Sequence, residues 1–424
     1  MHGPGRSVLF VGINYAPEET GIAPYTTDLA EHLAARGWQV TVLAGMPHYP
    51  RWRVSSAYRR RFRAREERNG VDVQRFRHYV PRSQSAARRG LYELTFLAHG
   101  ATATSLRRPD CVVGVVPSLS GGVIARLQAR RFRVPYGLII QDLVSPAAAQ
   151  SGVPGAAAMA RPVRAVEAGI ARRATAISVI TQSFRPYLLD AGVDADRIVD
   201  VPNWTHVSRP SGRAGEIRRS WGWDEDVSVV LHAGNMGYKQ GLDNVVEMAR
   251  LAGAEGRPLR FVLMGDGSDR KRLESLGQDV DALEFLDPQP AEVFMDVLAA
   301  ADVLVLNERA SVRDMSLPGK ITSYFLSGRP VVAAVRRDGV TARELERSGG
   351  ALVVAPEDPA TLLDAVSDLV ADQHLKDRLV SAASVFAEQH LDRSTLLARA
   401  ERFVAGLASG GSGTQPIEAT TISQ

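Results

Sequence analysis

The chain has 424 residues, of which 45% are hydrophobic and 23% charged, with a formal net charge of +4. This composition is globular and excludes a fibrous or wholly disordered chain, and no apolar run reaches the roughly 18 residues that span a bilayer. The length is too great for one ordinary core and indicates two domains, or three at most. The single cysteine, Cys111, excludes an internal disulfide and a cysteine-cluster metal site.

The amino-terminal stretch MHGPGRSVLFVGINY does not resemble a secretory signal. A signal needs a charged segment, a long apolar segment and a small-residue cleavage site, whereas the apolar run here ends after about seven residues. We therefore expect a cytoplasmic protein, at most peripheral on the inner face of the cell membrane.

Short apolar runs alternate with amphipathic stretches such as APYTTDLAEHLAARG in the first half of the chain. The apolar runs lie at 7–13, 39–45, 111–116, 136–142 and 176–181. Alternation of strand and helix predicts a parallel sheet covered by helices. We assign residues 1–204 to this first, Rossmann-like domain.

The first predicted strand is followed by the loop NYAPEETG, in which Glu18 and Gly21 precede a helical stretch. A glycine directly before a helix lets the phosphate of a ligand approach backbone N–H groups and the positive end of the helix dipole. The alternative is a plain strand-to-helix connection with a glycine at the cap. Gly21 is therefore a candidate for contact with an anionic ligand.

Residues 51–65, RWRVSSAYRRRFRAR, hold seven arginines, three aromatic residues and no acid. One interpretation is a solvated surface loop and helix, which is what charge runs usually are. Another is contact with anionic lipid headgroups or a phosphorylated substrate, because arginine pairs with phosphate and aromatic side chains settle at the water-lipid boundary. Nucleic acid is not expected as a partner, because no recognisable binding module accompanies the basic residues.

Pro, Ser and Gly cluster in VPNWTHVSRPSGRAG, residues 201–215, and mark the boundary between the domains. The alternation then restarts and predicts a second doubly wound domain over 205–385. Its apolar runs lie at 227–234, 259–264, 283–287, 302–307, 329–335 and 351–355. Helices are expected over residues 374–408, with the terminal one at 386–408, and the polar Gly/Ser tail at 409–424 is expected to be disordered.

The stretch HAGNMGYKQG leads from an apolar run through Gly234, Asn235 and Gly237 to Lys239 and Gln240. Small residues followed by a cation suit a diphosphate. The stretch has neither the GxxxxGK[ST] pattern of a mononucleotide loop nor the GxGxxG pattern of a dinucleotide fold. Neither an ATPase nor a dehydrogenase therefore follows from it.

A second stretch of this kind, SLPGKITSYFLSGRPVVAAV, begins at Ser316. Pro318 and Gly319 stand at a predicted helix start, with Lys320 in the first turn. That end of a helix prefers anions, so that a lysine there is unfavourable unless an anion is bound. Two such lysines in one domain, facing the glycine loop of the other across a cleft, indicate an anionic ligand.

The acidic triplets at 194–196, 224–226 and 279–281 have the DxD spacing of some metal sites. They adjoin predicted helices and loops and do not close a buried strand, which is typical of surface turns. We expect no metal ion and no cofactor, because lysines already supply positive charge for an anionic ligand.

Five stretches together resemble the large family of retaining GT-B glycosyltransferases, of the group 1 or family 4 type. These stretches are PEETGIAPYTTDLAEHLAARG, HAGNMGYKQGLD, FVLMGDGSDR, LPGKITSYFLSGRPVVAAV and GGALVVAPEDPATL, and the resemblance spans residues 7–400. The stretches GMPHYP and KITSYF are similar to motifs of the branch associated with colanic acid and other surface polysaccharides.

The resemblance implies two Rossmann-like domains that face a central cleft. It also implies a nucleotide-sugar donor held mainly by the second domain, an acceptor held mainly by the first, and a terminal helix at 386–408 that crosses back to the first domain. The donor-binding candidates are Gly21, Gly234, Asn235, Gly237, Gln240, Gly265, Asp266, Ser316, Leu317, Pro318 and Gly319. Glu18 and Gln141 are the acceptor-binding candidates, and Lys320, Lys239 and Asp142 the catalytic candidates.

The chain departs from the common pattern of this family at several positions. The usual pair of glutamates, eight residues apart, falls on Met315 and Ser323, and Asp314 or Glu308 could substitute from the same loop. The usual arginine of the first glycine loop is Asn235, and the usual lysine is displaced to Lys239, with Gln240 in its place. A histidine common at the end of a first-domain strand is replaced by Gln141, which precedes Asp142.

The sequence therefore predicts a metal-independent, retaining glycosyltransferase of the hexosyltransferase type. It would move a sugar from a UDP- or GDP-sugar to a glycan or lipid-diphosphate-linked acceptor in surface polysaccharide biosynthesis. The alternatives are a nucleotide-sugar epimerase or dehydrogenase, against which the missing GxGxxG counts, and a non-catalytic sugar-nucleotide-binding subunit of a polysaccharide assembly complex, which the missing glutamate pair keeps open.

Overall fold

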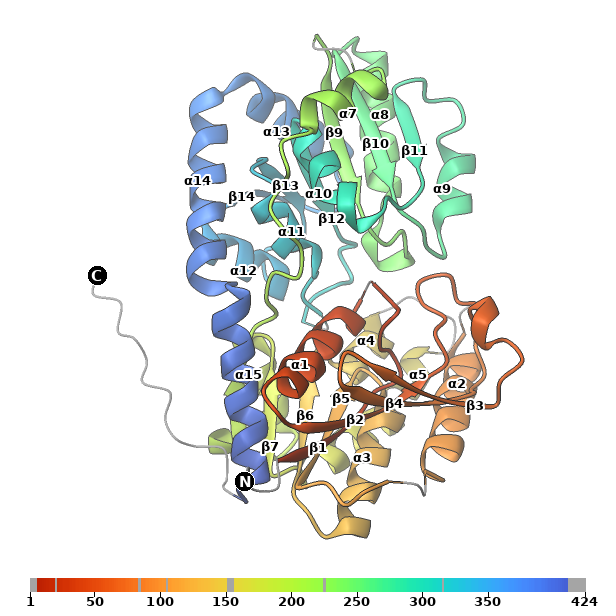
Figure 1. Ribbon diagram of the computed structural model, residues 1–424. Coiled ribbons are helices and arrows are strands. Elements are labelled where there is room, and N and C mark those ends of the chain that lie inside the picture. The colour runs from red at the N-terminus through yellow and green to blue at the C-terminus, as the bar shows by residue number, and fades with distance from the viewer. Residues whose placement is uncertain are drawn as a thin grey trace. The chain divides into compact units, whose positions relative to one another are not determined.

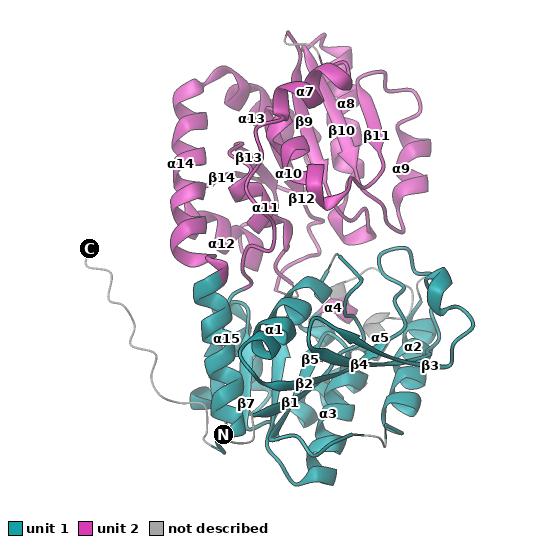
Figure 2. Cartoon of the chain, in the orientation of Figure 1, with its two compact units in different colours: residues 1–146, 153–202, 394–424 teal, residues 147–152, 203–393 magenta. Residues whose placement is uncertain are grey.

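The chain forms two compact units in the computed structural model (Figures 1 and 2). The structure describes residues 6–19, 21–82, 85–103, 106–150, 156–223, 226–314 and 316–410. Unit 1 comprises residues 1–146, 153–202 and 394–424, and unit 2 comprises residues 147–152 and 203–393. The change of unit after residue 202 lies inside the Pro-, Ser- and Gly-rich stretch of the sequence.

Unit 1 is built on an eight-stranded sheet. Its strands are β1 (Ser7–Val11), β2 (Gln39–Gly45), β3 (Arg63–Arg68), β4 (Val71–Phe76), β5 (Cys111–Val116), β6 (Tyr136–Ile140), β7 (Ala176–Val179) and β8 (Ile198–Asp200). They lie in the order β3-β4-β2-β1-β5-β6-β7-β8, and every neighbouring pair is parallel except β3 with β4. The central strand β5, CVVGVV, is buried at every position, as expected for a parallel strand covered by helices on both faces.

Two helices of unit 1 begin at serine caps. Ser118 Oγ accepts a hydrogen bond from the Gly121 N–H at 3.1 Å at the start of one helix, and Ser85 Oγ accepts from the Arg88 N–H at 3.3 Å at the start of another. The helices in this part of the chain are α1 (Ala23–Ala35), α2 (Ala86–Gly100), α3 (Leu119–Phe132), α4 (Val144–Gln150), α5 (Ala156–Ala171) and α6 (Arg185–Asp190).

Unit 2 is built on a six-stranded sheet that is parallel throughout. Its strands are β9 (Ser228–Ala233), β10 (Leu259–Met264), β11 (Leu283–Leu286), β12 (Val303–Asn307), β13 (Val331–Ala334) and β14 (Ala351–Val354), in the order β11-β10-β9-β12-β13-β14. Its helices are α7 (Ala214–Ser220), α8 (Asp243–Ala254), α9 (Arg270–Leu276), α10 (Ala291–Ala300), α11 (Lys320–Leu326), α12 (Val340–Ser348), α13 (Pro359–Ala371) and α14 (Gln373–His390). Two apolar cores, one on each face of the sheet, confirm the predicted doubly wound architecture.

The chain ends in two helices, as the sequence indicated for residues 374–408. These are α14 and α15 (Arg393–Ala408), and unit 1 includes the chain again from Ser394. Within unit 1, Glu401 of α15 accepts hydrogen bonds from His32 at 2.9 Å and Arg36 at 3.0 Å. Most of the predicted disordered tail, from residue 411 onward, lies outside the described residues.

The arginine-rich stretch at 51–65 is mostly an exposed loop with one short 3₁₀ helix, Ser56–Tyr58. Its last residues enter the edge strand β3, which the charge run did not indicate. β3 pairs antiparallel with β4 and has the sequence RAREER, in which only Ala64 is buried. A charged edge strand of this kind discourages pairing with other chains. In the described part of the protein, no helix is both long and apolar enough to cross a membrane.

Candidate functional site

The strand order of unit 2 reverses between β9 and β12. Counted along the chain within the unit, the order is 3-2-1-4-5-6, which is that of doubly wound nucleotide-binding sheets. At such a reversal the connections leave the two neighbouring strands toward opposite faces, so that a crevice opens outside their carboxyl ends. Here β9 ends at Ala233 and continues into Gly234, and β12 ends at Asn307 and continues into Glu308.

The loop after β9 packs directly on the loop after β10. A Cβ on Gly265 would lie 1.9 Å from the Gly234 carbonyl oxygen, and one on Gly267 would lie 2.4 Å from the Met236 carbonyl oxygen. The Met236 N–H donates to the carbonyl of Asp266 at 2.9 Å, which joins the two loops through their backbones. Glycine is thus required at both ends of the sequence GDG, because any side chain would push the loops apart.

Lys320 reaches the same loop from α11. Its Nζ lies 3.0 Å from His232 Nε2, and a Cβ on Gly234 would lie 3.5 Å from that Nζ. The other ring nitrogen of His232, Nδ1, lies 3.1 Å from the carbonyl of Val305 and is assigned as a donor to it. Burial, together with the charge of Lys320, holds the pKa of His232 well below its usual value, so that the ring is neutral. His232 Nε2 therefore accepts from Lys320 and directs the lysine toward Gly234.

The start of α11 is anchored by a buried tyrosine. Tyr324 lies one turn after Lys320, and its hydroxyl accepts a hydrogen bond from the Ala233 N–H at 2.8 Å. Residues four apart lie on the same face of a helix, so this bond at the end of β9 also places Lys320 beside that strand.

A second lysine, Lys239, lies in the loop after β9. Its Nζ donates to Ser316 Oγ at 3.0 Å, which ties this loop to the segment before α11. The side chain of Gln240 is buried, and its Oε1 accepts from the Gly237 N–H at 3.1 Å, so Gln240 shapes the loop from inside. Neither Lys239 nor Lys320 forms an ion pair with a carboxylate in the described part of the chain.

The charges of this cluster are not balanced. Burial lowers the pKa of Lys320 to about 7, with Glu308 opposing the shift and Lys239 adding to it. Burial likewise raises the pKa of Glu308, against the influence of Thr341, Lys239 and Lys320. An anion placed beside the two ammonium groups would favour their charged forms.

The other donor-binding candidates lie in the same loops. Asn235 is half-buried, Leu317 and Pro318 are half-buried and Gly319 is exposed. The carboxylate of Asp266 accepts a hydrogen bond from the Gly267 N–H at 2.7 Å.

The two positions of the family's glutamate pair supply no acid here. Met315 lies outside the described residues, and Ser323 Oγ donates to the carbonyl of Lys320 at 3.0 Å. Of the two possible substitutes, Asp314 pairs with Arg343. Glu308, in contrast, acts on the pKa of Lys320.

In unit 1 the acceptor-binding candidate Glu18 is buried and fully engaged. Its Oε1 accepts from the backbone N–H groups of His48 at 2.7 Å and Tyr49 at 2.9 Å, and its Oε2 accepts from Asn14 Nδ2 at 2.8 Å. A buried carboxylate that accepts backbone bonds orders the chain around it. Glu18 thus holds the segment after β2, where the sequence reads GMPHYP.

The remaining candidates of unit 1 are Gly21, Gln141 and Asp142, and Gly21 and Asp142 lie near Tyr49. A Cβ on Gly21, which has a φ of +71°, would lie 3.1 Å from the tyrosine ring. Burial, together with the charges of Asp142 and Glu18, raises the pKa of Tyr49 to about 12, so both carboxylates lie near this phenol. Gln141, just before Asp142, is buried.

Sequence reasoning missed His232, Tyr324 and Tyr49 as parts of these clusters. His232 and Tyr324 lie within apolar stretches, and Tyr49 lies in a motif that carried only the resemblance. Their role is to position other groups, and it depends on contacts far apart in the sequence. A histidine at the very end of a predicted strand, directly before a glycine loop, was the available signal for His232.

The acidic triplets lie apart from these clusters. Asp194 pairs with Arg197, and Asp279 pairs with Arg250 at 2.8 Å. Both aspartates are exposed, and part of the triplet at 224–226 lies outside the described residues. Among the residues that the structure describes, no cluster of three or more His, Cys, Asp and Glu side chains is arranged to hold a metal ion.

Two family models match successive parts of the chain. Residues 20–204 match the glycosyl transferase 4-like domain, and residues 227–372 match the glycosyl transferases group 1 model. The two matches together span most of the sequence and meet close to the change of unit.

Individual proteins are similar to the chain over nearly its whole length. The putative colanic acid biosynthesis glycosyl transferase WcaI of Escherichia coli K12 is 28% identical over 403 residues, which are 92% of this chain and 97% of that protein. The sucrose-phosphate synthase of Thermosynechococcus elongatus superposes with a TM-score of 0.75 at 18% identity, over 96% of this chain and 100% of that chain. The Anabaena protein Alr3699/HepE, solved in complex with UDP-glucose, superposes with a TM-score of 0.68 at 17% identity, over 94% of this chain and 99% of that chain. The two superpositions show a shared GT-B fold.

Proposed function

Because the chain belongs to the group 1 glycosyltransferases, with a glycosyl transferase 4-like first half, we propose that it is a retaining hexosyltransferase of surface polysaccharide biosynthesis. Its donor is a UDP- or GDP-sugar, and its acceptor is a glycan or a lipid-diphosphate-linked saccharide. The name of the Escherichia coli relative supports the pathway, and the UDP-glucose bound to the Anabaena protein supports the class of donor. Membership in this family counts against an epimerase or a dehydrogenase. It also counts against a non-catalytic subunit.

The observation that carries the proposal is the pair of lysines at the strand reversal of unit 2. Lys239 and Lys320 flank the glycine loop after β9, form no ion pair with a carboxylate among the described residues, and lie where doubly wound sheets bind nucleotides. Of the described acids, the buried Glu308 is the one that acts on the pKa of Lys320, and a diphosphate at this loop would supply further negative charge. Breaking the bond from the sugar to the diphosphate develops further negative charge there, which the two ammonium groups stabilise.

The choice of lysine at these two positions is itself informative. The chain holds 51 lysines and arginines, but only four of them are lysines: Lys239, Lys271, Lys320 and Lys376. Arginine has a planar fork and keeps its charge at any ordinary pH, whereas lysine is a compact cation whose pKa shifts readily on burial. Two of four lysines in one half-buried cluster therefore favour a site for a compact anion.

The remaining roles follow from position. Gly234, Gly265 and Gly267 keep the donor loop free of side chains, and Glu308 is the acid that stands in for the family's glutamate pair. In unit 1, Asp142 is the catalytic carboxylate on the acceptor side, and Glu18 orders the segment that carries Tyr49.

A thermal-shift panel of UDP, GDP and their sugars tests the donor. A true ligand at 100 times its dissociation constant should stabilise the folded protein by roughly 2.7 kcal/mol. The nucleotide of the donor is expected to raise the melting temperature by several degrees, and the matching nucleotide sugar should be turned over in the presence of an acceptor extract. A panel in which no nucleotide shifts the melting temperature would contradict the proposal.

We also propose peripheral contact of residues 51–65 with an anionic membrane. The segment leaves the carboxyl edge of the unit 1 sheet after β2, and Arg51, Arg60 and Arg61 are exposed. Exposed apolar side chains accompany this charge, with Phe62 55% exposed and Leu94 of α2 62% exposed. Basic and apolar side chains on one surface suit the headgroup region of a bilayer.

Replacing Arg51, Arg60 and Arg61 together by alanine should release the protein from anionic vesicles. Each basic residue near such a surface contributes about 1 kcal/mol at best, so partitioning should fall by about tenfold or more. Sedimentation with vesicles of phosphatidylglycerol and phosphatidylcholine measures the partitioning. High salt should release the parent protein from these vesicles as the mutation does.

A matched control removes Arg107, Arg108 and Arg130, which are also exposed in unit 1. These arginines lie before β5 and at the end of α3, hence at the amino edge of the same sheet. The control variant loses the same charge and should keep its partitioning. Equal release of both variants would show that net charge alone is responsible.

A further inference from the structure

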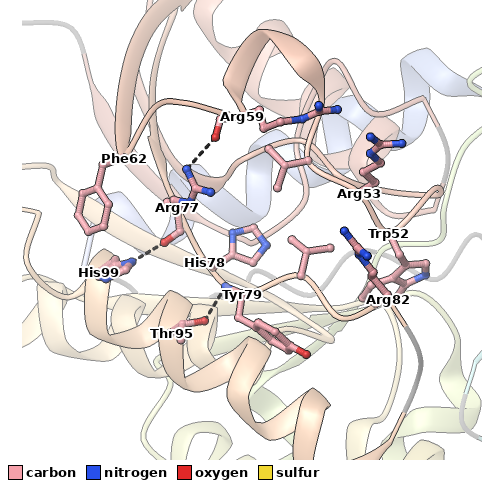
Figure 3. A pocket seen from close by; sticks show the side chains of 12 residues that line it. Trp52, Arg53, Arg59, Phe62, Arg77, His78, Tyr79, Arg82, Thr95 and His99 are labelled. Carbon is pink, nitrogen blue, oxygen red and sulfur yellow. Dashed lines mark hydrogen bonds between the residues drawn. The ribbon is translucent and has the colours of Figure 1, made fainter.

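Unit 1 contains a cavity of about 600 Å³ on the side of β4 and α2 (Figure 3). The residues that line it are Trp52, Arg53, Val54, Arg59, Phe62, Arg77, His78, Tyr79, Val80, Arg82, Thr95 and His99. Its size is that of ordinary small-molecule sites. None of these residues was a candidate of the donor or acceptor sets, although five belong to the arginine-rich stretch.

Four arginines line this cavity, and no acidic residue does. Within the described part of the chain, no carboxylate forms an ion pair with Arg53, Arg59, Arg77 or Arg82. Arg77 donates to the carbonyl of Arg59 at 2.7 Å, a bond that leaves its charge uncompensated.

Neighbouring arginines of the same edge are neutralised by carboxylates. Arg65 pairs with Asp72 at 2.7 Å, and Arg75 pairs with Glu66 at 2.6 Å. The arginines that line the cavity have no carboxylate partner of this kind among the described residues. A cavity with uncompensated guanidinium groups is complementary to an anion, and guanidinium groups bind phosphate through paired hydrogen bonds.

Aromatic side chains complete the wall. In Figure 3, Trp52 lies beside Arg53 and Arg82, and Phe62 and His99 lie on the opposite side. Trp52 has a φ of +49°, in the left-handed region that bulky residues rarely adopt, so the fold holds the indole in place at a cost. A fixed aromatic face next to a cation suits a ligand with an apolar ring face and a phosphate.

His78 adds no charge to the cavity. It is buried, its Nδ1 lies 3.3 Å from the carbonyl of Phe76, and a Cβ on Gly45 would lie 2.5 Å from the ring. Burial, with a smaller contribution from His48, lowers the pKa of His78 to about 3. The ring of His78 is neutral at physiological pH and contributes no charge to the attraction for an anion.

We propose that this cavity binds the phosphate end of a phosphorylated saccharide, with the phosphate on the arginines and the sugar ring against Trp52. The saccharide part rests on the proposed function, because a glycosyltransferase acceptor is a sugar. The phosphate would anchor the acceptor so that its growing end remains free.

Calorimetric titration of the full-length protein with glucose 1-phosphate tests the proposal. The titration is made with UDP present at saturation, so that the lysine cluster of unit 2 is occupied and cannot take the sugar phosphate. Inorganic phosphate, glucose and anionic vesicles are the comparison arms. We expect glucose 1-phosphate to bind more tightly than either phosphate or glucose alone.

The test variant replaces Arg53, Arg59 and Arg82 by glutamine and spares Arg77, whose side chain supports the wall. Loss of charge-assisted hydrogen bonds should weaken glucose 1-phosphate binding by at least about tenfold. The triple variant of Arg107, Arg108 and Arg130 loses the same charge outside the cavity and should bind as the parent does. Both variants should still bind UDP, which shows that they are folded.

Three results would overturn the proposal. The first is a parent that does not bind glucose 1-phosphate, and the second is an equal loss of affinity in the cavity and control variants. The third, equal affinity for inorganic phosphate and glucose 1-phosphate, would overturn the role of the sugar ring. A failure of both UDP and GDP to bind would instead contradict the proposed function, and this binding is measured separately before the titration. Where GDP is the nucleotide that binds, it replaces UDP in the titration and in the test of folding.

Discussion

Replacing Lys320 by alanine is expected to weaken the binding of the donor nucleotide by about tenfold to a hundredfold. Each hydrogen bond from a charged group contributes roughly 1.5–3 kcal/mol, and the lysine lies over the glycine loop where the diphosphate would sit. The transfer rate should fall further, by a hundredfold or more, because charge on the diphosphate grows in the transition state. Calorimetry with UDP or GDP and a transfer assay measure the two effects.

Lys271 supplies the matched control. It is an exposed lysine of α9 in the same unit, and its replacement by alanine should leave nucleotide binding unchanged. The Lys320 variant leaves His232 Nε2 without its donor, so binding is measured well below the melting temperature of each variant. If Lys320→Ala binds nucleotide as tightly as the parent, the lysine does not hold the diphosphate.

The lowered pKa of Lys320 also gives the interaction a pH dependence. Without ligand the pKa is about 7, and a bound diphosphate would raise it, so that binding takes up a proton above pH 7. Nucleotide affinity should therefore fall as the pH rises above 7, where the phosphates, with a second pKa near roughly 6, are already ionised. The variant Lys320→Arg keeps its charge, so its nucleotide affinity should not fall in this pH range. If the pH dependence of that variant equals that of the parent, Lys320 is not the origin of the pH dependence.

Replacing Gly265 by alanine is expected to destabilise unit 2 by roughly 3 kcal/mol or more. The residue has a φ of +144°, which side chains avoid, and its Cβ would lie 1.9 Å from the Gly234 carbonyl oxygen. The melting transition of unit 2 should fall by about 6–12 °C for a unit of this size. Nucleotide affinity should fall as well, because the displaced loop is the one that Lys320 covers.

Gly253 of α8 is the matched control in the same unit. Nothing lies within 4 Å of a Cβ placed there, and the residue is helical. Its replacement by alanine should raise stability by about 0.5–1 kcal/mol, because glycine is unfavourable inside a helix. Differential scanning calorimetry should thus show shifts of opposite sign, and a Gly265→Ala variant as stable as the parent would contradict the tight packing of the two loops.

The strands that sequence reasoning found and those it missed differ in their surroundings. β1, β5 and β12 are continuous apolar runs because both their faces are buried, and such runs are visible in any window of the sequence. β3, RAREER, carries a single buried residue and lies at the edge of the sheet, so it has no apolar run to detect. β8 has only three residues, and β4, VDVQRF, interrupts its apolar residues with polar ones, so neither presents a continuous apolar run.

The candidate site divides in a similar way. Lys239, Lys320 and the glycines of the loops after β9 and β10 were visible because glycine and lysine at strand and helix ends have local chemical meaning. His232 and Tyr324 were not visible, because their work is to position Lys320 and the start of α11. This positioning depends on contacts with partners such as the β9 backbone. The hydrophobic periodicity of α11 does not predict such contacts.

The sequence by itself determined the class of fold and the family, since both follow from local patterns: alternating strands and helices, glycine loops and motifs. The tertiary structure alone decided which of these patterns meet. Lys320 and His232 are 88 residues apart, and Lys239 and Ser316 are 77 apart. Strands that are buried on both faces look alike in sequence, so their order in the sheet is fixed only when the sheet packs. That order in turn decides which loops meet at the reversal between β9 and β12.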